Sequence, residues 1–267
     1  MKHDSRYIRS ELTFLRYSEE ALGHCFVSPS DFERFYAHLP DDDSKNEFLR
    51  VASFYLFLVK KGSWVAGQGT AIDYLTNSYK LVGIFSLLES LSEQEHQDFF
   101  RWLCSSRETD RIFPIESRES LNALFANYNR VHGATNFCVA FFERLSDEQQ
   151  AELMRGIQVG GKSVSSVKRA VQVLYGLRSR FVHEGTLLVQ LSDGPVLSTI
   201  KKKTHLFDIS LPKVAELFEQ ALLLHFATKH KVALQRTVKR LVFFRLLNIV
   251  PEGSKRISFQ AVLDPTP

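Results

Sequence analysis

Residues 167–185 read VKRAVQVLYGLRSRFVHEG, and this stretch gives the clearest indication of how the chain folds. On a helical wheel that advances 100° per residue from Val167, further apolar residues fall within about 80° on either side. These residues are Ala170, Val171, Leu174, Leu177 and Phe181. The pattern predicts an amphipathic helix that buries one face, with Ser163 able to cap its start and Gly185 ending it.

Arg178 falls at about 20° on the same wheel, in the middle of the apolar arc, whereas Arg180 falls on the polar side. A guanidinium keeps its charge, so burial requires an anion or hydrogen-bond acceptors nearby. A buried carboxylate, a helix C-terminus or the phosphate of a ligand could each meet that need. Position alone leaves an internal ion pair and a ligand contact equally open.

His183 follows Arg178 by five residues, which on a continuous helix places the two side chains about 140° apart. They can then act together only under one of two conditions. Either the helix kinks or ends near Phe181–Gly185, or a second subunit completes the site.

The rest of the chain is predicted to be mainly α-helical. Residues 44–60 are almost continuously apolar in their second half and fit either a buried helix or a strand. Two apolar segments around the sequence SDGP indicate a short β-hairpin, with strands at 187–191 and 196–200. Further helices are expected at 70–91, 118–131, 134–145, 146–158, 211–229 and 233–249. The expected fold is a helical bundle with an N-terminal helical extension and a possible short β-hairpin insertion.

Residues 105–117, SSRETDRIFPIES, are polar and rich in turn-forming residues, and they mark the best candidate domain boundary. We therefore expect an N-terminal, mostly helical region of unknown role at 1–110. A helical domain at 111–250 and a C-terminal tail at 251–267 would follow.

Charge is distributed unevenly along the chain. Residues 1–153 hold 16 Lys and Arg against 23 Asp and Glu, a balance of −7, whereas residues 154–267 hold 18 against 7, a balance of +11. A basic C-terminal half points to an anionic partner such as nucleic acid, or to contact with the acidic half of the same chain. Three widely spaced cysteines, no apolar leader and no long apolar run predict a cytoplasmic protein without a membrane partner.

The segment LYGLRSRFVHEG, residues 174–185, resembles the signature of the HEPN superfamily, especially the Apea-like members of bacterial defence systems. The resemblance covers this motif and its helical surroundings from about 118 to 248, and does not extend to residues 1–105. It implies a HEPN-type helical bundle that forms a homodimer with a composite site. It also implies a metal-independent endoribonuclease, acting in antiviral defence by abortive infection or as a toxin, with a possible regulatory or trigger protein as partner.

Carried onto this sequence, the resemblance implies that Arg178 holds the scissile phosphate and that His183 moves protons during attack by the ribose 2′-OH. Arginine offers a bidentate fork to phosphate oxygens, and histidine suits either proton-transfer role. Ser179 would be a supporting contact, although the superfamily often has Asn or Asp there. Tyr175 and Glu184 are further supporting candidates, and no metal or cofactor is expected.

Two other patterns compete with or extend this interpretation. Residues 156–163, GIQVGGKS, match the P-loop pattern, but the preceding stretch is helical and polar where a P-loop needs an apolar strand. If the chain binds RNA, several basic side chains are candidate phosphate contacts. They are Arg180, Lys201, Lys202, Lys203, Lys229 and Lys231. The main alternative to a nuclease is a non-catalytic HEPN-like dimerisation or binding module, with Arg178 in a structural ion pair.

Overall fold

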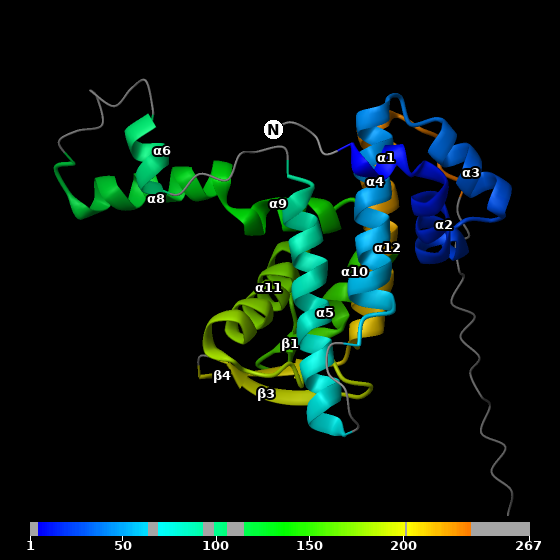
Figure 1. Cartoon of the computed structure of the whole chain (residues 1–267). Helices are drawn as coiled ribbons and strands as arrows, with labels where there is room; N and C mark the ends of the chain where they lie inside the picture. The colour runs from blue at the N-terminus through cyan, green and yellow to red at the C-terminus, as the bar shows by residue number, and fades with distance from the viewer. Residues whose placement is uncertain (1–4, 64–68, 93–98, 106–114, 201, 236–267) are drawn as a thin grey trace, which may run out of the picture. The chain divides into compact units, whose positions relative to one another are not determined.

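The computed structural model describes residues 5–63, 69–92, 99–105, 115–200 and 202–235. This part of the chain is mainly helical and carries one small sheet (Figure 1). The first helices are α1 (Arg6–Arg9), α2 (Glu11–Leu22), α3 (Pro29–Ala37), α4 (Asp42–Tyr55) and α5 (Thr70–Ser90). The later helices are α6 (Phe99–Ser105), α8 (Arg118–His132), α9 (Ala134–Phe142), α10 (Asp147–Arg155), α11 (Val167–Glu184) and α12 (Leu211–His230). The strands are β1 (Ile157–Val159), β2 (Lys162–Ser163), β3 (Val196–Ile200) and β4 (Lys203–Phe207).

Side-chain caps fix the starts of several helices. The Ser146 hydroxyl accepts a hydrogen bond from the Gln149 backbone, and the Gln149 side chain accepts one from the Ser146 backbone, which forms a capping box at α10. At α11 the cap is Ser166, which accepts from the Arg169 backbone. The expected cap, Ser163, lies in β2 instead, because the chain makes a hairpin before the helix begins.

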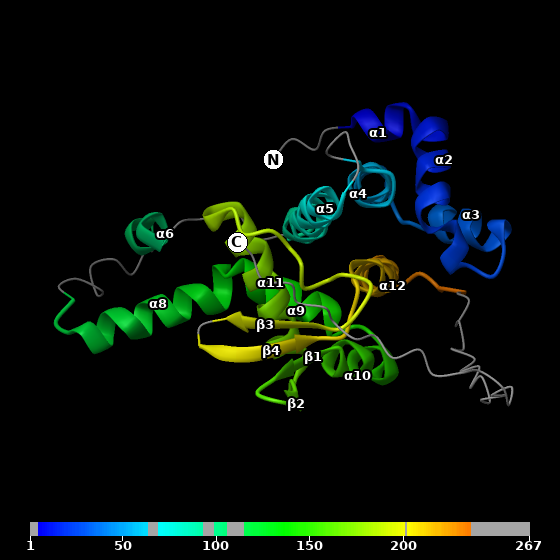
Figure 2. The same cartoon turned by 90° about the horizontal axis from the view of Figure 1, so that it is seen from below.

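The apolar segment at residues 44–60 is helical. Residues 44–55 form most of α4, and the segment continues as a π-helical turn, η2 (Leu56–Lys60). Its aromatic rings meet rings of α12, with Phe48 5.2 Å from Phe226 and Tyr55 5.0 Å from Phe218 between ring centres. In Figures 1 and 2, α4, α5 and α12 run side by side. Most side chains between Val51 and Val59 are buried, which explains the nearly continuous apolar run that periodicity could not assign, whereas Phe54 and Phe57 are 41% and 43% exposed.

One compact unit extends over residues 1–237, and it includes both sides of the boundary expected near residue 110. Helix α5 packs against α9, α11 and α12, so segments before and after that boundary share a core. The predicted helix at 233–249 lies almost entirely outside the described residues, and so does the predicted tail at 251–267.

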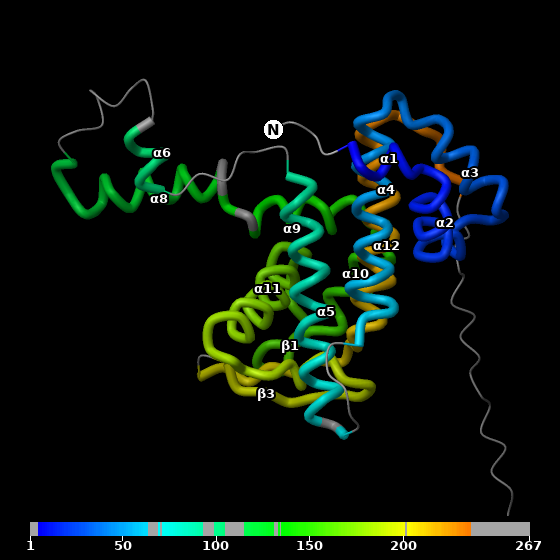
Figure 3. Tube along the Cα trace, in the orientation of Figure 1, coloured from blue at the N-terminus to red at the C-terminus, as the bar shows by residue number. Residues whose placement is uncertain are grey.

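The four strands form an antiparallel sheet in the order β2–β1–β4–β3 (Figure 2). The hairpin prediction was half wrong: residues 196–200 form β3, but their partner is β4 rather than 187–191. Lys202 sits in the turn between these strands with a positive φ of 62°. Figure 3 follows the chain from α11 into β3 of this hairpin.

Candidate functional site

Helix α11 is continuous through both motif residues. It ends at Gly185, whose φ of 66° is left-handed and whose amide donates to the Phe181 carbonyl, so the predicted helix end is confirmed. Because Arg178 and His183 both precede this end, they keep the angular separation of a regular helix. Within one chain they face different surroundings.

The inward face of α11 holds Arg178 against α5. Its Nη2 atom lies 3.4 Å from the Glu89 carboxylate, and the side chains of Arg178 and Glu89 are 17% and 29% exposed. The Tyr175 hydroxyl donates to the other carboxylate oxygen of Glu89 at 2.9 Å, and the guanidinium carbon lies 5.3 Å from the centre of the Tyr175 ring. Of the two sequence-based interpretations of Arg178, this geometry matches the internal ion pair.

The charge of Glu89 also shapes the titration of its neighbours. Burial, followed by the hydrogen bond to Glu89 and its charge, raises the pKa of Tyr175 to about 12. Burial and then the charge of Glu89 raise the pKa of the Cys138 thiol, on α9, to about 12 as well. The Nε atom of Arg178 is buried and has no hydrogen-bond partner among the described residues. Arg178, Tyr175 and Glu89 therefore form a partly buried cluster between α5 and α11, with Cys138 of α9 beside it.

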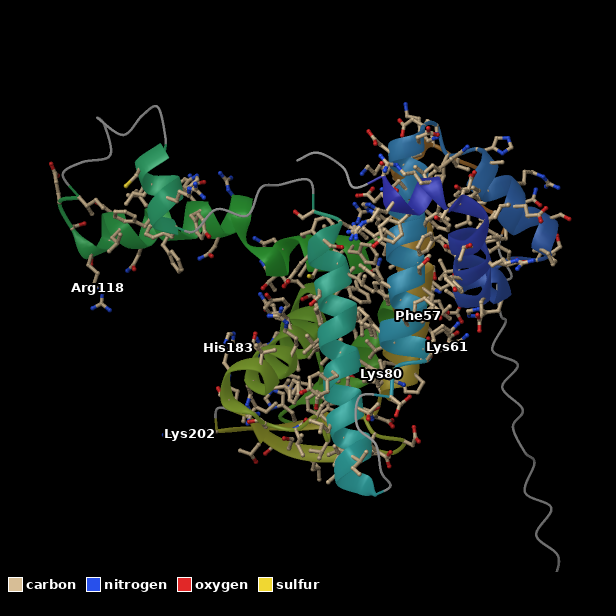
Figure 4. All side chains as sticks on the ribbon, in the orientation of Figure 1. Phe57, Lys61, Lys80, Arg118, His183 and Lys202 are labelled. Atoms are coloured by element: carbon tan, nitrogen blue, oxygen red, sulfur yellow. The ribbon has the colours of Figure 1, made fainter. Side chains whose placement is uncertain are left out.

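The opposite face of α11 forms one wall of a groove of about 610 Å³. The hairpin of β3 and β4 forms the other wall, and Figure 4 labels His183 on the helix and Lys202 at the hairpin turn. The groove is lined by Arg169, Gln172, Val173, Gly176, Leu177, Ser179, Arg180, His183, Glu184, Thr199, Ile200, Lys203 and His205. Steps of three and four residues along α11 bring Arg169, Arg180 and His183 to this face.

The groove is predominantly basic. Arg169 and Arg180 line the helical wall, Lys203 lines the hairpin wall, and Glu184 is the one carboxylate among the lining residues. Glu184 lies 3.3 Å from Nε of Arg180, four residues earlier, where both side chains are partly or largely exposed. Such an exposed pair is weak, so the guanidinium stays available for an anionic ligand.

Two imidazoles line the same groove. His183 is exposed on α11, whereas His205 is buried in β4 and its Nδ1 lies 2.9 Å from the Lys203 carbonyl oxygen. The carbonyl accepts, so Nδ1 carries the proton in the neutral ring and Nε2 is then an acceptor. The groove therefore combines cations that suit phosphate oxygens with groups that suit proton transfer.

The structure brings together part of the predicted site. Ser179, Arg180, His183, Glu184 and Lys203 line the groove, whereas Arg178 and Tyr175 are not among its lining residues. Arg169 and His205 were not among the residues predicted for the site. A wheel centred on His183 points to Arg169, but His205 reaches the groove through strand pairing that no local pattern encodes.

The remaining predicted phosphate contacts lie elsewhere. Lys202 is exposed at the hairpin turn, and Lys201 lies outside the described residues. Lys229 pairs with Glu47 at 3.1 Å, about 27 Å along α12 from the start of that helix. Lys231 caps the end of α12 with a positive φ of 56°. The two lysines of α12 therefore belong to a different part of the surface from Lys203.

The P-loop pattern at 156–163 forms a hairpin instead of a phosphate cradle. Gly160 and Gly161 adopt positive φ values of 61° and 79° in the turn between β1 and β2. Lys162 follows in β2 with an exposed side chain, and the next helix begins at Val167. A phosphate-binding loop requires the helix N-terminus directly behind the glycines, and here five residues, 162–166, separate Gly161 from α11.

Comparisons with protein-family models, with curated proteins and with solved structures found no match. Among the described helices, none combines the length and apolar character that crossing a membrane would require.

Proposed function

We propose that this chain binds RNA in the α11 groove and cleaves it as a metal-independent endoribonuclease. The observation that supports this proposal best is the placement of His183 beside Arg169 and Arg180, with Lys203 and His205 on the facing wall. Phosphate contacts from basic side chains supply most of the affinity for a nucleic-acid backbone. A histidine among those contacts is suited to move the protons of phosphate chemistry.

In the proposed reaction, the ribose 2′-oxygen forms a bond to phosphorus and the bond from phosphorus to the 5′-oxygen breaks. The 2′-OH proton passes to an imidazole, and the leaving 5′-oxygen takes up a proton from an acid. His183 performs one of these transfers, and His205 is the candidate for the other. The products are a 2′,3′-cyclic phosphate and a 5′-hydroxyl.

The proposal assigns Arg178 a positioning role. Its ion pair with Glu89 holds α11 against α5, and its side chain points away from the groove that His183 lines. Arg180, Arg169 and Lys203 take over the phosphate-binding role that the family resemblance implies for Arg178. A homodimer with a composite site is required only if Arg178 itself contacts the phosphate, because one chain does not bring it to His183.

Cleavage of single-stranded RNA by the purified chain, without added divalent cations, tests the proposal. We expect His183→Ala to lower the rate by about 10²-fold or more, as loss of a proton-transfer group does. The matched control is His38→Ala, because His38 is also an exposed histidine and lies at the end of α3. Undiminished cleavage by the His183 variant overturns the assignment.

The Glu89–Arg178 pair favours one second candidate, a non-catalytic HEPN-like binding module. Here the motif arginine is structural and the groove only binds RNA or another anionic partner. Stable RNA binding by the wild-type chain with no cleavage on any substrate would select this alternative. A role in antiviral defence or as a toxin rests on the family resemblance, and toxicity that depends on His183 in cells is its test.

A further inference from the structure

A second cluster of chemically active side chains shares no residue with the groove. His24 and Cys25 occupy a short turn, η1 (Gly23–Cys25), at the end of α2, and Glu219 lies in the middle of α12. His24 Nε2 is 2.7 Å from Glu219 Oε2, and Cys25 Sγ is 3.5 Å from that nitrogen and 3.6 Å from that oxygen. These three atoms lie within 4.8 Å of one another.

The arrangement differs from a nucleophilic relay. A cysteine–histidine–carboxylate relay uses one imidazole nitrogen for the thiol and the other for the carboxylate. Here the same atom, Nε2 of His24, approaches both partners, and the thiol also contacts the carboxylate directly. Three donor atoms that converge on one point are what a metal ion requires.

The spacing of the donors suits zinc. Bonds of about 2.0–2.1 Å to nitrogen and oxygen and about 2.3 Å to sulfur place tetrahedral ligands roughly 3.3–3.6 Å apart. The two separations that involve Cys25 Sγ, 3.5 and 3.6 Å, already fall there. The His24–Glu219 separation of 2.7 Å is that of a hydrogen bond and must widen by about 0.6 Å on metal binding.

The second oxygen of Glu219 is held by other groups. Oε1 accepts from the Tyr55 hydroxyl at 2.6 Å and lies 3.1 Å from Nζ of Lys60, which also donates to the Ala21 carbonyl. Such outer contacts orient a metal-binding carboxylate and leave its other oxygen to the ion. Burial raises the pKa of Glu219, but hydrogen bonds from His24 and Tyr55 and the charge of Lys60 outweigh it and hold that pKa below its usual range.

We propose that His24 Nε2, Cys25 Sγ and Glu219 Oε2 form a binding site for one zinc-class divalent cation, with a fourth position open on the side of His24. The His24 side chain is 41% exposed, which gives the ion a path, whereas Cys25 and Glu219 are buried. Zinc accepts sulfur, nitrogen and oxygen together, which calcium and magnesium do not.

Binding changes protons in a defined way. Cys25 releases its thiol proton, and His24 carries its remaining proton on Nδ1 so that Nε2 can bind the metal. Nδ1 of His24 lies 3.4 Å from Lys60 Nζ. Once Nδ1 carries a proton, both atoms are hydrogen-bond donors and this contact becomes unfavourable. Lys60 then keeps the Ala21 carbonyl and Glu219 as its partners. The thiolate and carboxylate together balance the charge of the ion.

Such an ion ties the end of α2 to the middle of α12 and stabilises the packing of the N-terminal helices. It lies outside the residues that line the α11 groove, so this inference does not depend on the proposed nuclease. The site could not be predicted from the sequence, because Cys25 and Glu219 are separated by 194 residues and adjacent His24 and Cys25 match no ligand spacing.

Titration of the metal-free full-length chain with Co²⁺ tests the proposal, because a cobalt–thiolate bond gives a charge-transfer absorption. We expect saturation at one Co²⁺ per chain, displacement by one equivalent of Zn²⁺, and a rise in melting temperature with Zn²⁺. Cys25→Ser is expected to abolish the absorption. Cys104→Ser is the matched control, since Cys104 is an exposed thiol on α6.

A variant at His24, the exposed ligand, tests the proposal even if Cys25→Ser does not fold. His24→Gln changes a partly exposed side chain, and circular dichroism checks that its helix content is unchanged. We expect this variant to bind Co²⁺ at least tenfold more weakly than the wild type. The proposal is overturned if the wild-type chain gives no thiolate absorption, or if a folded His24→Gln or Cys25→Ser variant binds as the wild type does.

Discussion

Arg178 and His183 lie on different faces of the same unbroken helix, about 140° apart around its axis. Arg178 meets Glu89 on the inward face, and His183 lines the groove on the outward face. The sequence motif is therefore divided between a site that stabilises the fold and a site that can contact a ligand. This division makes the contributions of the two residues separable by experiment.

The effects of replacing Arg178 and Glu89 on the free energy of unfolding should be coupled rather than additive. Both side chains are less than one-third exposed, and Tyr175 shares the same carboxylate. We expect Arg178→Ala to lower the free energy of unfolding by about 1–3 kcal/mol, because Glu89 then loses a charged partner. In a double-mutant cycle with Glu89→Ala, the coupling energy should be about 1 kcal/mol.

Urea denaturation of the four proteins measures this coupling. The pair Lys61–Glu20 is a matched control, since its side chains are 50% and 49% exposed and such pairs contribute little. Additive effects at Arg178 and Glu89 would show that the ion pair does not stabilise the helix packing.

The groove should account for the salt dependence of RNA binding. Arg180→Gln and Lys203→Gln each remove one cation from the groove, and loss of Arg180 also leaves Glu184 without its pair. For single-stranded RNA we expect the slope of log affinity against log salt to fall by about 0.7 for each phosphate contact removed. Fluorescence anisotropy at several salt concentrations measures that slope.

Lys231→Gln is the control for this series, because Lys231 is exposed at the end of α12 and does not line the groove. It should leave the slope unchanged. An equal decrease in the slope for the Lys231→Gln and Lys203→Gln variants would show that the RNA is not confined to the groove and also contacts the end of α12.

Local periodicity made much of α11 predictable from sequence. The apolar arc correctly placed Leu174 and Leu177 in the core, and the glycine at 185 ended the helix where expected. The inward position of Arg178 also followed from the arc. Its partner did not, because Glu89 lies 89 residues away and nothing local links the two.

The groove was less predictable, because its second wall depends on strand pairing. The sequence SDGP suggested a turn after residue 191, yet β3 pairs with β4 through a turn at Lys202. Turns with a positive φ are usually marked by glycine or asparagine, and a lysine there is uncommon. The sequence around Lys202 therefore gives no signal for this turn. His205 and Lys203 reach the groove only through this register.

The alkaline stability of the protein should depend on Tyr175. Its pKa is raised from 10.0 to about 12 by burial and by its hydrogen bond to Glu89. A raised pKa in the folded state gives stability that is fully present below pH 10 and is lost as the pH rises through about 12. We therefore expect Tyr175→Phe to lose less unfolding free energy than the wild type between pH 10 and pH 12.

Chemical denaturation at a series of alkaline pH values compares the two proteins. Groups that titrate there without interacting with Tyr175 are common to both proteins and cancel in the difference, and the comparison is made in a Cys138→Ser background because Cys138 interacts electrostatically with Tyr175. Parallel curves for wild type and Tyr175→Phe would mean that the phenol titrates as it does in the unfolded chain.

Gly156 and Gly176 should respond in opposite directions to the same substitution. Gly156 joins α10 to β1, and a Cβ atom there would lie 2.7 Å from Cβ of Ile209. Because that atom is fixed close to the backbone, the neighbouring chain must shift, and we expect Gly156→Ala to cost about 1–3 kcal/mol. At Gly176, inside α11, a Cβ atom would meet nothing within 4 Å.

Alanine at position 176 should therefore stabilise the protein by about 0.5–1 kcal/mol, because it reduces the backbone freedom of the unfolded chain and favours the helix. Thermal and urea denaturation of both variants measure whether each substitution raises or lowers the free energy of unfolding.

Since Gly176 lines the groove, the added methyl group also tests ligand contact there. A loss of RNA affinity in this more stable variant would place the RNA against the helical wall of the groove, whereas unchanged affinity would place it nearer the hairpin.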